Sequence, residues 1–197
     1  MKIRAAWWRP IQDWPRVVFC LVLVGLMSSS ATAGRTIPLV EGVKGEDAAV
    51  VRSLLDDGVD VNQREADGTT ALHWAARLDS LELAELLISE GANVSLVNAF
   101  GVVPLSLAAI NGSSLMIERL LDAGADPNTS GRHGETVLMT AARTGRADAV
   151  KTLLARGANV DATLASGQTA LMWAAAEGHT AAMQSLIDNG ADLNART

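Results

Sequence analysis

The chain has 197 residues, of which 49% are hydrophobic, and its 22 acidic residues outnumber 16 basic ones to give a formal net charge of −6. This length is sufficient for one domain with a sizeable core. Binding to nucleic acid or to anionic membranes relies on basic residues that neutralise phosphates, so an acidic chain disfavours both as partners.

The N-terminal segment has the three parts of a secretory signal peptide. An uncharged apolar run over residues 17–27 precedes Ala31-Thr32-Ala33 and follows four basic residues, Lys2, Arg4, Arg9 and Arg16. A basic region, an apolar core and an A-x-A site define such a peptide. The sequence therefore predicts a cleavable signal peptide over residues 1–33, cut after Ala33, and a periplasmic or secreted protein.

An uncleaved membrane anchor is the alternative for this segment. Its apolar run has 11 residues, whereas a bilayer-spanning helix needs roughly 20, so we expect no stable membrane insertion after cleavage.

Cleavage also removes Cys20, the single cysteine, and leaves 12 basic and 21 acidic residues, a net charge of −9. A chain without cysteine forms no disulfide, so its stability must come from packing.

Three series of residues recur with a period of 33 after this segment. Glycines that follow pairs of large aliphatic residues stand at positions 58, 91, 124, 157 and 190. A second glycine series stands at positions 68, 101, 134 and 167, and alanine pairs begin at positions 75, 108, 141 and 174. A shared period without insertions indicates repeats that stack on their neighbours and bury a continuous core.

The repeat resembles the ankyrin repeat. The residues that carry the resemblance read Asp67-Gly-Thr-Thr-Ala-Leu-His-Trp-Ala-Ala76, with later segments such as Gly157-Ala-Asn-Val-Asp161 and Gly190-Ala-Asp-Leu-Asn194. A 33-residue period with a T-P-L-H-x-A signature is typical of that family. The resemblance implies an all-α repeat solenoid of five stacked helix-turn-helix repeats joined by short β-turn or hairpin loops, with repeats at 34–66, 67–99, 100–132, 133–165 and 166–197.

Local sequence features agree with this architecture. Side-chain oxygens suited to cap helix N-termini are expected at Thr70, Thr136 and Thr169. Pro104 suits a first helical position, where its missing N–H costs nothing. The glycine after each second helix, such as Gly157, suits a left-handed C-terminal cap.

No constellation of catalytic or metal-ligating residues is found. His73 and His179 occupy positions where ankyrin repeats commonly carry structural histidines, and His133 is expected at an exposed turn tip. Three histidines in separate repeats, without cysteines, give no metal-ligand spacing. Phosphate-binding loops, H-E-x-x-H helices and nucleophile elbows do not occur in the sequence. We therefore expect no enzymatic activity, no metal and no cofactor.

The resemblance implies that turn tips and the exposed side of the first helices form a concave surface that binds a protein partner. We expect the partner-binding residues to be Trp74, Arg77, Leu78, Phe100, Val102, Ile110, His133, Glu135 and Arg143.

Phe100 is the centre of this hypothesis, because it stands where an aspartate is usual and is the only phenylalanine of residues 34–197. With Val102, Leu78 and Ile110 it is expected to form an exposed apolar patch, and such patches mark interaction sites. The alternative is that Phe100 packs against its neighbours. Trp74 is expected to be partly buried, as is Trp173.

Two further questions concern partners. The last repeat is as apolar as the interior ones, whereas solenoids normally end in a polar capping repeat, so self-association through this end is an alternative.

The principal interpretation of the sequence is an exported protein–protein interaction scaffold. The alternatives are a secreted effector acting on a host protein and an accessory subunit of an exported enzyme. Hydrolase activity is the least favoured interpretation, because no nucleophile and base are identifiable in the sequence.

Overall fold

A computed structural model describes residues 37–197, which form an all-helical repeat solenoid. The predicted signal segment lies outside the described residues. The helices of the described part are α1 (Pro38–Lys44), α2 (Ala48–Asp56), α3 (Ala71–Leu78), α4 (Leu81–Ser89), α5 (Pro104–Asn111), α6 (Ser114–Asp122), α7 (Val137–Arg143), α8 (Ala147–Ala155), α9 (Ala170–Ala176) and α10 (Thr180–Asp188).

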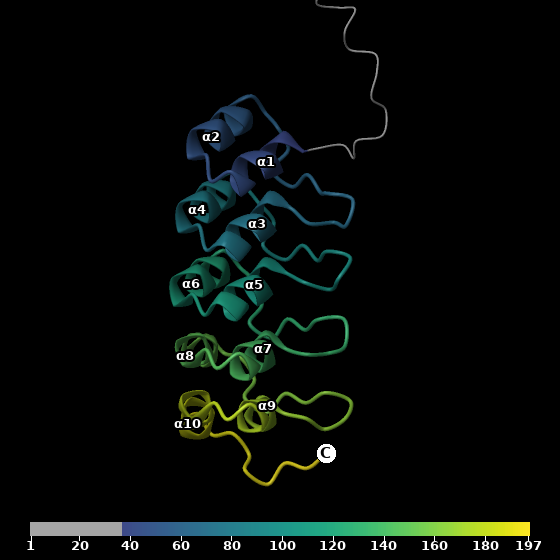
Figure 1. The fold of residues 1–197 in the computed structure, drawn as a ribbon, viewed down its shortest axis with the longest axis vertical. Helices are drawn as coiled ribbons and strands as arrows, with labels where there is room; N and C mark the ends of the chain where they lie inside the picture. The colour runs from purple at the N-terminus through teal and green to yellow at the C-terminus, as the bar shows by residue number, and fades with distance from the viewer. Residues whose placement is uncertain (1–36) are drawn as a thin grey trace, which may run out of the picture. The chain divides into compact units, whose positions relative to one another are not determined.

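The helices of residues 37–197 lie in two parallel rows. Figure 1 shows α1, α3, α5, α7 and α9 stacked in one row, and the even-numbered helices stacked in the other. We call these the first helices and the second helices. Each first helix packs against the second helix that follows it and against the first helices of adjacent pairs.

Four hairpin loops project beside the first helices, over residues 64–69, 97–102, 130–135 and 163–168 (Figure 1). Antiparallel bridges such as Arg64 with Thr70 and Ser130 with Thr136 close two of them. The predicted short hairpins are thus present, and they place their tips on one side of the stack.

The predicted starts of first helices and the predicted glycine cap of a second helix are confirmed. The hydroxyls of Thr70, Thr136 and Thr169 accept hydrogen bonds from backbone N–H groups three residues further on. Pro104 is the first residue of α5, whose N-cap residue Val103 provides no side-chain cap. Gly157 has the left-handed φ of 89° expected after α8.

The core runs continuously between the two rows. Alanines such as Ala75, Ala76, Ala108 and Ala109 are fully buried, and small side chains here allow first helices to pack closely. Leucines of the second helices, including Leu153, fill the space between the rows with no exposed surface. The apolar periodicity of the sequence therefore corresponds to a shared core, as expected for a stacked solenoid.

Two turns between a first and a second helix depart from the others. Asp79, after α3, has a left-handed φ of 57°, and Glu46, before α2, has a φ of 52°, whereas glycines stand at the corresponding positions 112, 145 and 178. A residue with a Cβ atom is strained in this conformation. The backbone conformation of Asp79 therefore lowers the stability of the folded chain locally.

Candidate functional site

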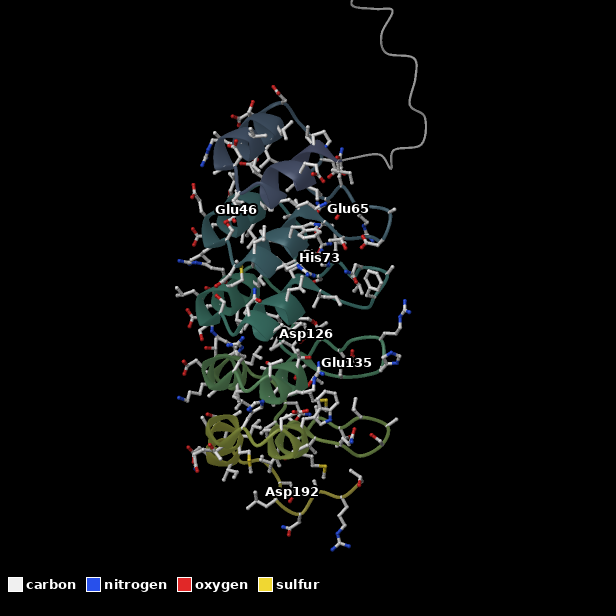
Figure 2. The ribbon with its side chains drawn as sticks, viewed as in Figure 1. Glu46, Glu65, His73, Asp126, Glu135 and Asp192 are labelled. Atoms are coloured by element: carbon white, nitrogen blue, oxygen red, sulfur yellow. The ribbon has the colours of Figure 1, made fainter. Side chains whose placement is uncertain are left out.

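The predicted partner-binding residues all lie on first helices or hairpin loops. Helix α3 carries Trp74, Arg77 and Leu78, helix α5 carries Ile110, and Arg143 is the last residue of α7. One hairpin loop carries Phe100 and Val102, and the next carries His133 and Glu135. Figure 2 shows Glu65, His73 and Glu135 on this side of the stack. We call the first helices and the four hairpin loops the loop face.

Phe100 is the most exposed of the predicted apolar residues. Its exposed fraction is 67%, compared with 42% for Ile110 and 38% for Leu78. The alternative in which Phe100 packs against its neighbours is therefore wrong. Phe100 lies in the hairpin loop that precedes α5, and Ile110 lies near the C-terminal end of that helix.

Two of the predicted polar residues are held within their own loop. The backbone N–H of His133 donates to Glu135 Oε2 at 3.1 Å. The imidazole of His133 is exposed, in agreement with its expected place at a turn tip. This loop is tied to its neighbour by the guanidinium of Arg132, which donates to the backbone carbonyl of Ala99, next to Phe100.

His73 has the structural role expected of it. Its side chain is buried, Nδ1 lies 2.8 Å from Thr70 Oγ1, and Nε2 lies 3.1 Å from the carbonyl oxygen of Val102. The imidazole therefore joins the start of α3 to the following hairpin loop. Burial lowers the pKa of His73 from its ordinary value. His179 has a similar role, because its Nε2 lies 3.0 Å from the carbonyl oxygen of Arg143.

A cluster of charged side chains surrounds Trp74 that the sequence did not predict. The indole N–H of Trp74 donates to Glu65 Oε2 at 2.6 Å, and Lys44 Nζ donates to Glu65 Oε1 at 2.8 Å. Lys44 Nζ also lies 4.6 Å from the centroid of the Trp74 ring, and the guanidinium carbon of Arg77 lies 5.6 Å from it. Trp74 is partly buried, as expected, and here it anchors a network of charges on the loop face.

The loop face also carries an open pocket at its other end, with a volume of about 260 Å³. Residues of α7, α9 and the hairpin loop 163–168 contribute to its lining, among them Arg143, Gln168 and Trp173. The guanidinium carbon of Arg143 lies 5.3 Å from the centroid of the Trp173 ring. Of the predicted partner-binding residues, Arg143 is the one that lines this pocket. Because the pocket forms between stacked helices, a scan of local motifs does not detect it.

Neither a metal-holding group of side chains nor a membrane-spanning helix is found in the described residues. Within residues 37–197, no three His, Cys, Asp or Glu side chains are grouped so that they could hold a metal ion. The helices of the same residues are too short or too polar to cross a bilayer.

Stacked helix pairs with projecting hairpin loops define a helical repeat solenoid. A family model described as ankyrin repeats (3 copies) matches residues 39–131 and residues 105–197. The chain therefore belongs to the ankyrin-repeat family, whose members are generally protein–protein interaction modules and typically non-enzymatic scaffolds. A search of curated proteins found no match.

Proposed function

We propose that this chain is an exported ankyrin-repeat scaffold that binds a protein partner through its loop face. The observation that carries the proposal is the 67% exposure of Phe100 on a projecting hairpin loop. A large aromatic side chain that is left exposed is a typical anchor of a protein interface, because its burial contributes much of the binding free energy.

The distribution of charge also favours the loop face. The first helices and hairpin loops carry five basic and four acidic residues, whereas the rest of residues 37–197 carries six basic and seventeen acidic ones. A partner therefore meets a nearly neutral surface on the loop face and a strongly acidic one elsewhere. Like-charge repulsion disfavours the other surfaces for most acidic proteins.

Substitution of Phe100 tests this proposal. Affinity capture from the native cells, with crosslinking, is compared for the unchanged chain, Phe100→Asp and Leu115→Asp. Leu115 is a matched control, because it lies on the second helix α6 and is 61% exposed. We expect Phe100→Asp to lose the captured partner with unchanged helicity and melting temperature, and Leu115→Asp to retain it. Retention of the partner by Phe100→Asp would contradict the proposed site.

We further propose that the chain contains five repeats, with bounds at 34–66, 67–99, 100–132, 133–165 and 166–197.

We also propose that the protein is exported by a signal peptide over residues 1–33. The basic residues, the apolar run and the A-x-A site of this segment support export. Mass spectrometry of the protein from fractionated cells tests it. A chain that begins at Gly34 in the periplasm or medium is expected, and an intact N-terminus in the membrane fraction would indicate an anchor instead.

Self-association at the C-terminal end is a second candidate. In this part of the chain Leu193 is 68% exposed and Ile187 is 37% exposed, and exposed apolar residues favour association. Sedimentation over a range of concentrations tests this: a concentration-dependent increase in mass is expected, and a monomer at every concentration would exclude it.

A further inference from the structure

Two tryptophans of the loop face each lie beneath a cation from the preceding first helix. Trp74 and Trp173 are 99 residues apart, as are the cations above them, Lys44 and Arg143. A distance of 99 residues is three periods of 33, so the pairs occupy equivalent positions in the stack. In each pair, a cation from the end of one first helix lies over the indole of the next first helix.

At the N-terminal pair, a carboxylate of the chain itself completes the arrangement. Glu65 accepts hydrogen bonds from both the indole N–H of Trp74 and Nζ of Lys44. The hydrogen bond from Lys44 raises the pKa of this lysine, since it favours the charged form. The N-terminal pair is thus an occupied carboxylate site.

At the C-terminal pair, the carboxylate is missing. The residue 99 positions after Glu65 is Leu164, which packs against the core and has no acceptor. Among residues 37–197, the indole N–H of Trp173 and the guanidinium of Arg143 have no hydrogen-bond or ion-pair partner. The equivalent donors at the C-terminal pair thus have no carboxylate of the described residues as a partner and face the open pocket.

A second replacement leaves space for a ligand at the C-terminal pair. Ala176 stands 99 residues after Arg77, which lies over the Trp74 ring. The short side chain of Ala176 lines the open pocket of about 260 Å³ together with Trp173 and Arg143. A guanidinium stacked on an aromatic ring keeps its N–H groups available at its edge for a carboxylate.

We propose that this pocket binds the carboxylate of a glutamate or aspartate side chain of the protein partner, in the place that Glu65 takes beside Trp74. The carboxylate accepts hydrogen bonds from the indole N–H of Trp173 and from Arg143. This inference rests on the proposed function, and it names the chemistry that one end of the loop face recognises. The lining of the pocket carries one basic side chain, Arg143, which attracts a carboxylate, and one acidic side chain, Glu177, which opposes it by repulsion.

Short peptides test the site without knowledge of the partner. The probes are a blocked pentapeptide with a central glutamate and the same peptide with glutamine. The readout is the ¹H–¹⁵N signal of the Trp173 indole in the full chain, assigned by its loss in Trp173→Phe. We expect the glutamate peptide to shift this signal with about tenfold tighter binding than the glutamine peptide, because hydrogen bonds to a charged group are stronger. The Trp74 signal should not respond.

Three variants sharpen the test. Leu164→Glu places an internal carboxylate where the proposed ligand binds, so it should shift the Trp173 signal by itself and abolish the response to the peptide. Position 65 shows that this place in the repeat accommodates a glutamate. Arg143→Gln should reduce binding about tenfold, and Glu177→Gln should tighten it by removing repulsion.

Equal responses to the two peptides, or an undiminished response in Leu164→Glu, would overturn the carboxylate site. These outcomes are distinct from failure of the proposed function, which is judged by capture of the partner in Phe100→Asp. Loss of capture in Phe100→Asp without a peptide response at Trp173 would leave the scaffold function standing and remove this inference.

Discussion

The imidazole Nε2 of His73 lies 3.1 Å from the carbonyl oxygen of Val102, so a side chain of α3 holds the hairpin loop that precedes the next pair of helices. Nε2–H donates to this carbonyl, and Nδ1 accepts from the backbone N–H and the hydroxyl of Thr70. This arrangement favours the neutral imidazole, because a proton on Nδ1 would face the backbone N–H of Thr70, which can only donate. Val102 is two residues from Phe100, so His73 also supports the loop that carries the proposed binding residue.

The burial of His73 predicts a loss of stability in acid. Its pKa is lowered in the folded chain from the ordinary value of 6.5, so the unfolded chain binds the proton more readily. Its contribution to stability is present above pH 6.5 and is lost as the pH falls toward the folded-state pKa. We expect the melting temperature to decrease between about pH 7.5 and pH 5.5.

Substitution separates this effect from other titrations. His73→Gln should melt at a lower temperature near neutral pH and lose most of the decrease, whereas His133→Gln, at an exposed loop tip, should keep it. An unaltered pH profile in His73→Gln would show that the histidine is not responsible.

The central packing predicts a large effect of Leu153→Ala. Leu153 has no exposed surface and lies between the two rows of helices. Removal of its side chain should lower the free energy of unfolding by about 2–5 kcal/mol, since a cavity remains. Denaturant unfolding followed by circular dichroism measures this change. Leu115→Ala, at an exposed position of α6, should change it by less than about 0.5 kcal/mol, and an equally small effect at Leu153 would contradict the stacked core.

The strained turn after α3 predicts a stabilising substitution. Asp79→Gly should raise the free energy of unfolding by about 0.5–1 kcal/mol, because relief of the left-handed conformation outweighs the added freedom of glycine in the unfolded chain. Asp79→Asn removes the charge at the helix C-terminus but keeps the Cβ atom, so its gain should be smaller. Thermal unfolding of both variants checks this order. A gain in Asp79→Asn equal to that in Asp79→Gly would assign the effect to charge alone.

The repeat period predicts much of the fold because each local signal recurs at a fixed position. The caps at Thr70, Thr136 and Thr169 depend on a hydroxyl and the three residues that follow it, so sequence is sufficient to find them. The structural role of His73 follows from family resemblance in the same way.

The charge cluster and the pocket could not be predicted in this manner. Lys44, Glu65 and Trp74 belong to three different elements, and they meet only when adjacent helices stack. The pocket beside Trp173 is lined by the short side chain of Ala176, and no sequence motif indicates that a pocket forms there. The available signal was the shared spacing of 99 residues between the two tryptophan–cation pairs. The exposure of Phe100 also required the structure, because its position in the sequence fits both a packed and an exposed side chain.

Site-specific photocrosslinking tests the central claim most directly. A photoreactive amino acid is placed at position 100 or position 115 of the full chain in its native cells, and adducts are identified by mass spectrometry. These positions carry similarly exposed residues, 67% for Phe100 and 61% for Leu115, on the loop face and on a second helix respectively. A specific protein adduct from position 100 and none from position 115 is the result that we predict. An adduct from position 115 alone would contradict a partner that binds the loop face.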